Sequence, residues 1–164
     1  MASMAGSYYG VLADTLYNSC KKKGYDLDIY ITDYSSQVTK KIMSKRIDGA
    51  VILHSGLTYD DVNILKKIEI PVVFLDREIS HKYIGSVVFD SYGAGRQIGE
   101  YFIRMGFKNM AFIQGAMGTY DSLERYKGYR DALAEAGLQL KNTNILYGAF
   151  EKTTSYYAMK GFIE

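Results

Sequence analysis

Pro71-Val72-Val73-Phe74-Leu75-Asp76-Arg77 is a proline followed by four apolar residues, an acid and a guanidinium. A short apolar run bounded by a proline is typical of a strand buried on both faces of a parallel sheet. Polar groups at the carboxyl end of such a strand lie where open α/β sheets bind ligands. Asp76 can accept hydrogen bonds from hydroxyl groups and Arg77 can donate several, so the pair predicts a sugar-like ligand. A surface ion pair or a helix-capping aspartate is the alternative.

Length and composition predict an ordinary globular protein. The chain has 164 residues, of which 48% are hydrophobic and 23% are charged, enough for one good core or two small lobes. The net charge of +2 is too small to predict a nucleic-acid or membrane partner, and no apolar stretch approaches the length of a membrane span. The single cysteine, Cys20, excludes an internal disulfide and fits a reducing compartment. Residues 1–7 have no secretory signal pattern and are interpreted as a leader or tag, so we expect a cytoplasmic protein.

Strand and helix patterns alternate along the chain. The apolar and β-branched runs predict strands at 25–32, 48–54, 71–75, 86–89, 109–114 and 144–147. The helical patterns cover 7–23, 33–45, 60–68, 92–105, 122–135 and 153–164, with Thr58 placed to cap the third. This alternation indicates an α/β fold in which β/α crossovers build parallel sheets flanked by helices. The chain begins and ends on a helix, whereas doubly wound folds usually start on a central strand, so both edges look cut.

Six segments, taken in order, resemble one protein family. They are Ser7-Tyr-Tyr-Gly with its helix into Lys23-Gly-Tyr-Asp-Leu, Arg46-Ile-Asp-Gly-Ala-Val-Ile-Leu, Ile70-Pro-Val-Val-Phe-Leu-Asp-Arg77, Val87-Val-Phe-Asp-Ser-Tyr-Gly-Ala-Gly95, Met105-Gly-Phe-Lys-Asn-Met-Ala-Phe-Ile-Gln-Gly115 and Arg125-Tyr-Lys-Gly-Tyr-Arg-Asp-Ala-Leu-Ala-Glu-Ala-Gly-Leu138. Together they resemble the effector-binding core of the LacI/GalR family of bacterial transcription regulators. That core has the fold of periplasmic sugar-binding proteins (type I), in which flavodoxin-like lobes are paired.

The resemblance implies a domain organisation and a set of partners. Residues 8–107 would form an N-terminal lobe that lacks its first, central strand, and residues 108–164 would form part of a second lobe. The DNA-binding headpiece and hinge helix of the family are not matched, so DNA would be a partner only through a headpiece outside this sequence. We expect a small-molecule effector, a homodimer or a strand-sharing assembly that fills the missing strand, and no cofactor or metal.

The resemblance also implies the ligand-binding residues, in a cleft between the lobes. They are Tyr8, Tyr9, Asp76, Arg77, Asp90, Arg125 and Phe150. Several have a structural alternative: one of the two adjacent tyrosines can pack in the core, Asp90 can cap the following helix, and Phe150 can be an ordinary core residue. Arg125 has the strongest case, because an arginine on this helix gains little from a surface pair with Glu124.

Other motifs carry less weight. The glycine-rich segment from Gly93 to Gly99 resembles a dinucleotide loop, but it does not follow the first strand, and its small residues more simply allow close helix packing. No arrangement of acid, base and nucleophile is present in the sequence, so we expect a binding protein rather than an enzyme. The second hypothesis for the function is an isolated or engineered α/β fragment without ligand activity. The third hypothesis is a nucleotide-dependent enzyme.

Overall fold

The computed structural model describes residues 7–44 and 46–164, which divide into two compact units. The first unit takes the described residues up to Ile47 together with Gly56–Ile68, and the second takes Asp48–Ser55 and Glu69–Glu164. Of the predicted leader, residues 1–6 lie outside the described residues, and Ser7 begins the first helix. The predicted lobe boundary after residue 107 stays a prediction.

The first unit is helical. Its helices are α1 (Ser7–Lys22), α2 (Ser35–Met43) and α3 (Tyr59–Leu65), and α2 packs against α3. Thr58 begins α3 with a capping box, because its hydroxyl accepts a hydrogen bond from the Asp61 backbone N–H at 3.2 Å while the Asp61 carboxylate accepts one from the Thr58 N–H at 2.9 Å. The predicted cap at Thr58 is therefore confirmed.

The second unit holds every strand that the structure assigns within the described residues. The strands are β1 (Ala50–Ile52), β2 (Val72–Phe74), β3 (Ile84–Ser86), β4 (Phe112–Gln114) and β5 (Ile145–Tyr147). The helices are α4 (Ser91–Arg104), α5 (Tyr120–Glu135) and α6 (Lys152–Ile163), with a short 3-10 turn at Asn142–Asn144. One sheet has the order β1-β2-β3 and the other pairs β4 with β5, all in parallel. The predicted parallel α/β architecture is confirmed.

Strand β2 is the centre of the three-stranded sheet. Val72 and Phe74 are buried, as the continuous apolar run predicts, while Val73 between them is half-buried. On one side β2 pairs with β1, and on the other it pairs with β3. The second edge of β1 carries no strand partner among the described residues.

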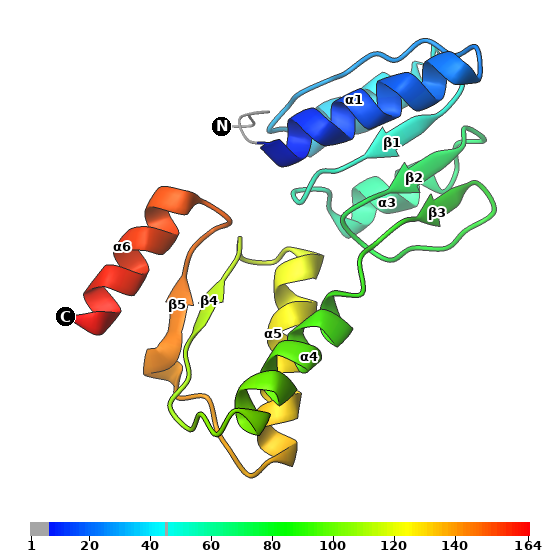
Figure 1. Ribbon diagram of the computed structural model, residues 1–164. Helices are drawn as coiled ribbons and strands as arrows, with labels where there is room; N and C mark the ends of the chain where they lie inside the picture. Colours follow the sequence, from blue (N-terminus) through cyan, green and yellow to red (C-terminus); the bar gives the residue numbers. More distant parts are fainter. Residues whose placement is uncertain (1–6, 45) are drawn as a thin grey trace. The chain divides into compact units, whose positions relative to one another are not determined.

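Helices α4 and α5 cross so closely that their glycines are required. A Cβ on Gly95 would lie 2.1 Å from the Arg125 carbonyl oxygen, and one on Gly128 would lie 2.0 Å from the Tyr92 carbonyl oxygen. The glycine-rich segment therefore serves helix packing, as its simpler interpretation predicts. Figure 1 shows β4 and β5 between this helix pair and α6.

The strand predicted at 25–32 is wrong. No strand is assigned there, and Ile29, Tyr30 and Ile31 are all about half exposed. A β-strand requires a neighbour that accepts and donates its backbone hydrogen bonds, and this segment pairs with no strand in the described part of the chain. Its β-branched and aromatic composition is therefore not sufficient to form a strand.

The strand predicted at 86–89 begins two residues earlier in the structure. Register with β2 sets the boundary, since Val72 is opposite Ile84 and Phe74 is opposite Ser86. Ile84 is the buried residue of this strand, whereas Val87 and Phe89 are exposed. The apolar pattern of the sequence alone favoured the wrong end of this segment.

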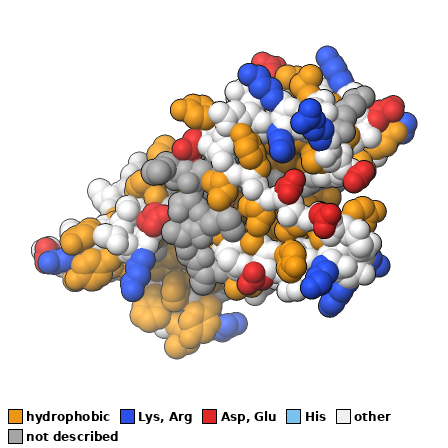
Figure 2. All heavy atoms as spheres, turned by 90° about the horizontal axis from the view of Figure 1, so that it is seen from above, with side chains coloured by type: hydrophobic (Ala, Val, Ile, Leu, Met, Phe, Trp, Pro, Cys, Tyr) orange, Lys and Arg blue, Asp and Glu red, His pale blue; other side chains and the backbone are white. Residues whose placement is uncertain are grey.

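Much of the apolar surface stays uncovered. Figure 2 shows hydrophobic side chains interspersed with charged ones over the face in view. Exposed rings and aliphatic chains include Tyr59, Tyr157 and Ile163. Among the described residues, no helix combines the length and apolarity required to cross a membrane.

Candidate functional site

Asp76 and Arg77 form a mostly buried ion pair at the carboxyl ends of β1 and β2. The Arg77 Nη2 lies 3.1 Å from Asp76 Oδ2, and the side chains are 21% and 10% exposed, respectively. The His54 backbone N–H donates to Asp76 Oδ2 at 3.2 Å, and the His54 carbonyl oxygen accepts from Arg77 Nη2 at 2.8 Å. The pair therefore ties the end of β2 to the end of β1. The two residues do form an ion pair, but the pair is mostly buried and not the surface pair of the alternative.

This arrangement fixes both charged groups in place. Arg77 also donates from Nε to Asp76 Oδ1 at 3.2 Å, so that two nitrogens of the guanidinium meet two oxygens of the carboxylate. A buried charge is tolerated only when it is paired and hydrogen-bonded, and these contacts provide that compensation. The edge of the sheet thus presents a rigid polar pair with its geometry already set.

Arg125 on α5 belongs to a second polar group, which also contains Ser91 and Asp121. Its Nη2 lies 3.4 Å from the Ser91 hydroxyl, and that hydroxyl in turn donates to Asp121 Oδ1 at 2.9 Å. Ser91 is buried and is the first residue of α4. It directly follows Asp90, which the sequence predicts to be a ligand-binding residue. Sequence analysis did not predict that Ser91 and Asp121 join this polar group; the available signal was the position of Ser91 beside Asp90.

Phe150 lies close to Arg125 in a strained loop. The Arg125 guanidinium carbon is 6.0 Å from the centre of the Phe150 ring. Phe150 and Ala149 both have positive φ angles, 59° and 54°, which side-chain-bearing residues rarely adopt. The ring lies against Gly115, since a Cβ there would meet a Phe150 ring carbon at 2.2 Å. The ring is nevertheless 56% exposed, so Phe150 is not an ordinary core residue.

Asp90 has a structural task. Its Oδ1 accepts a hydrogen bond from the Gly93 backbone N–H at 2.8 Å and so caps α4. The capping alternative is therefore confirmed, and a contact between Asp90 and a ligand stays a prediction.

Tyr8 and Tyr9 lie on α1 in the first unit. Their rings meet edge to face with centres 5.3 Å apart, and both are more than one third exposed. The alternative that one of them packs in the core is therefore wrong. Asp76, Arg77, Asp90, Arg125 and Phe150 belong to the second unit.

A hydrogen bond within the second unit joins Glu78, next to Arg77 in the chain, to Tyr120, next to Asp121. The Tyr120 hydroxyl donates to Glu78 Oε2 at 3.4 Å. Partial burial of the phenol raises the pKa of Tyr120, and the negative charge of Glu78 raises it further. Tyr120 therefore stays protonated at neutral pH and keeps donating. Glu78 follows Arg77 in the chain, and Tyr120 precedes Asp121.

The structure also has a pocket of about 490 Å³ in the first unit, which includes none of the predicted site residues. It is lined by Tyr30, Gln37, Lys40, Lys41, Ser44 and Arg46. Sequence analysis missed this cluster, although the basic residues near 40–46 were visible.

A protein-family model and curated relatives match nearly the whole chain. The model described as periplasmic binding proteins and sugar binding domain of LacI family matches residues 2–164. The transcriptional repressor PurR of Pasteurella multocida is 24% identical over 164 residues, which cover 97% of this chain and 49% of that protein. The PurR repressor of Histophilus somni is 26% identical and covers 93% and 47%. The chain thus spans about half the length of the curated relatives it matches.

Solved structures show the same fold. A sugar-binding transcriptional regulator of the LacI family from Enterococcus faecalis matches with a TM-score of 0.81 and 26% identity, over 99% of this chain and 59% of that one. The transcriptional regulator CelR in complex with cellobiose matches with a TM-score of 0.80 and 23% identity, over 98% and 50%. The folding pattern described above is therefore shared with regulators of this type.

Proposed function

Because the chain belongs to the family of periplasmic binding proteins and LacI-family sugar-binding domains, we propose that it is the effector-sensing part of a transcription regulator. The effector is a small, sugar-like molecule. The protein then acts by differential affinity: the ligand binds one arrangement of the domain more tightly and so shifts an equilibrium that a DNA-binding part reads. It acts as a dimer in the cytoplasm. It binds DNA through a separate headpiece.

The exposed ring of Phe150 beside the Arg125 guanidinium is the observation that carries this proposal. A polyol presents an apolar C–H face and a rim of hydroxyl groups. The ring offers a flat apolar surface, while the guanidinium offers several donors that can be aimed at hydroxyl oxygens. The positive φ at Phe150 supports the proposal, because strained backbone of this kind persists where the surrounding structure enforces it and clusters at binding sites.

The remaining predicted residues have supporting parts in this proposal. Asp76 and Arg77 form a preorganised donor and acceptor pair, whose contacts to His54 hold it in position before a ligand arrives. Tyr8 and Tyr9 lie in the first unit, and a role for them in binding the effector stays a prediction. The curated relatives are named as transcriptional repressors. This supports a binding protein rather than a nucleotide-dependent enzyme.

A purine-type ring is the second candidate effector. The name PurR of the curated relatives favours it, and a planar heterocycle also stacks on a phenylalanine while accepting hydrogen bonds from arginine. The two candidates differ chemically, since a purine offers ring nitrogens and two flat faces, whereas a sugar offers hydroxyl groups around a saturated ring.

Calorimetric titration with a panel of monosaccharides, cellobiose and purine bases tests both candidates. We expect one class to bind saturably and to raise the melting temperature of the chain. Arg125→Ala should weaken that binding by about tenfold or more, because a charge-assisted hydrogen bond is lost. Arg104→Ala is the matched control: Arg104 also lies over an aromatic ring, 5.7 Å from the centre of Tyr101, but outside the candidate site.

Two results would contradict the proposal. If no sugar or purine binds, the chain alone has no effector site, and the reading as an α/β fragment without ligand activity is favoured. If Arg125→Ala and Arg104→Ala weaken binding equally, the effector lies elsewhere. Phe150→Ala gives an independent check, since it removes the stacking surface without changing the charge.

A further inference from the structure

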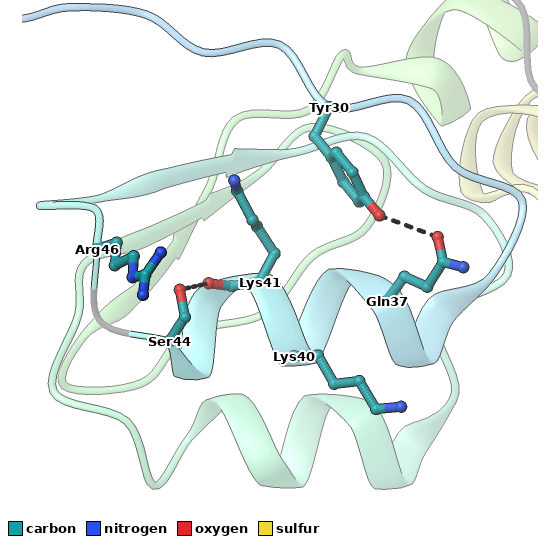
Figure 3. Close-up of a pocket in the computed structure, with 6 residues that line it drawn as sticks. All are labelled: Tyr30, Gln37, Lys40, Lys41, Ser44 and Arg46. Carbon is teal, nitrogen blue, oxygen red and sulfur yellow. Dashed lines mark hydrogen bonds between the residues drawn. The ribbon is translucent and has the colours of Figure 1, made fainter.

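We propose that the pocket on the first unit binds a small phosphorylated metabolite, at a site separate from the effector site. The pocket lies between the end of α2 and the segment around Tyr30 (Figure 3). Its volume of about 490 Å³ falls within the range of roughly 300 to 1,000 Å³ that is usual for small-molecule sites. The proposal does not depend on the proposed function, because it uses none of the same residues.

The charge of the pocket is one-sided. Three of its six lining residues, Lys40, Lys41 and Arg46, are cations, and none of the six is acidic. Within residues 7–44 and 46–164, none of these cations forms an ion pair with a carboxylate. Gathering like charges without a counter-charge is unfavourable, and a bound anion would remove that repulsion. The chemistry of the lining therefore selects an anion.

Two of the cationic side chains, those of Lys41 and Arg46, line the pocket together with the Tyr30 ring. In Figure 3, Lys41 rises from α2 between Arg46 and Tyr30, whereas Lys40 points away from them. The Lys41 ammonium lies 5.9 Å from the centre of the Tyr30 ring, which holds it over a half-exposed aromatic face. An ammonium and a guanidinium on two sides of one space can both donate to the oxygens of a phosphate group.

The rim of the pocket is ordered by hydrogen bonds. Gln37 Oε1 accepts from the Tyr30 hydroxyl at 2.9 Å and from the Thr32 hydroxyl at 2.7 Å. With its oxygen occupied in this way, the Gln37 amide nitrogen is left to donate. The pocket therefore combines two cations, one neutral donor and a ring face, a set that suits a phosphate attached to an organic group.

A competing explanation places the lysines at the negative end of the α2 dipole. Lys40 and Lys41 do lie in the last turn of α2, where a positive charge is favourable. Two carbonyl groups of that turn are already satisfied, because the Ser44 backbone N–H donates to the Lys40 oxygen at 3.1 Å and the Ser44 hydroxyl donates to the Lys41 oxygen at 2.6 Å. The dipole also gives no account of Arg46, which follows the helix and points to the same pocket.

Titration with inorganic pyrophosphate and with ribose 5-phosphate tests the proposal, at constant ionic strength and with amide NMR shifts as the readout. We expect saturable binding, with the shifts concentrated at Tyr30, Gln37 and the end of α2. Lys41→Gln and Arg46→Gln should each weaken binding by about tenfold, and Lys41→Arg should retain it. Lys82→Gln is the matched control, because Lys82 also lies over a tyrosine ring, 4.8 Å from the centre of Tyr83, outside the pocket.

The results that overturn the proposal are distinct from those that test the effector site. Absence of saturable binding by both phosphates overturns it, and so does equal weakening in Lys41→Gln and Lys82→Gln, which would mean a general charge effect. All three side chains changed, Lys41, Arg46 and Lys82, are exposed, so circular dichroism should confirm that each variant folds. Effector binding should stay unchanged in Lys41→Gln.

Discussion

Replacing Gly95 by alanine should separate the helix pair that positions Arg125. The new Cβ would lie 2.1 Å from the Arg125 carbonyl oxygen, while an ordinary contact begins at 3.4 Å. The two backbones must therefore move apart by 3.4 − 2.1 = 1.3 Å. The obstructing atom belongs to the backbone of α5, so no side chain can rotate to make room.

The expected cost follows from two opposing terms. Overpacking a tight core contact costs up to roughly 3 kcal/mol, and the better helix propensity of alanine returns about 1 kcal/mol. The net loss of about 2 kcal/mol corresponds to a fall of about 4 to 8 °C in Tm for a chain of this length. Because Arg125 moves with its own carbonyl group, effector affinity should fall in the same variant.

Thermal unfolding followed by circular dichroism measures the effect. Gly161→Ala on α6 is the matched control, since a Cβ there meets nothing within 4 Å. That substitution should raise Tm by about 2 to 4 °C, because it only improves helix propensity. If Gly95→Ala raises Tm as Gly161→Ala does, α4 and α5 do not cross closely at Gly95. The position inferred for Arg125 would then also be wrong.

Three further substitutions test local features of the structure. The Arg96 guanidinium donates a hydrogen bond to the Glu135 carboxylate and so lowers the pKa of that carboxyl below its usual 4.5. The ion pair therefore stabilises the fold fully above about pH 4.5, and this stabilisation is lost as the pH falls through the lowered pKa. Below about pH 4.5, Tm should decline less steeply in Glu135→Gln than in the unchanged chain. The buried Ser122 hydroxyl has no hydrogen-bond partner among the described residues, so Ser122→Ala should leave Tm unchanged or raise it, and a fall of several degrees would contradict this. Thr58→Ala should cost about 1 kcal/mol in denaturant unfolding by removing the cap that bonds to Asp61, and Thr58→Ser should retain most of it.

The candidate site could be predicted only in part from sequence. Asp76 and Arg77 follow a proline-bounded apolar run, so their place at the end of a strand was visible in the order of residues. That they bond to the backbone of His54 was not, because 22 residues separate Asp76 from His54 and only the pairing of β1 with β2 brings them together. The contacts from Arg125 to Ser91 and Phe150 likewise depend on the crossing of α4 and α5 and on a loop with positive φ.

The sequence by itself determined the elements that depend on neighbouring residues. Thr58 caps α3 and Asp90 caps α4 because a cap is made within three residues, and the alternation of strand and helix follows from local apolar periodicity. Tertiary structure decided whether 25–32 pairs, where β3 begins and which polar groups meet, since each requires a partner far along the chain. A backbone hydrogen bond between strands exists only when both strands are in place, and that is why composition alone predicted a strand where none forms.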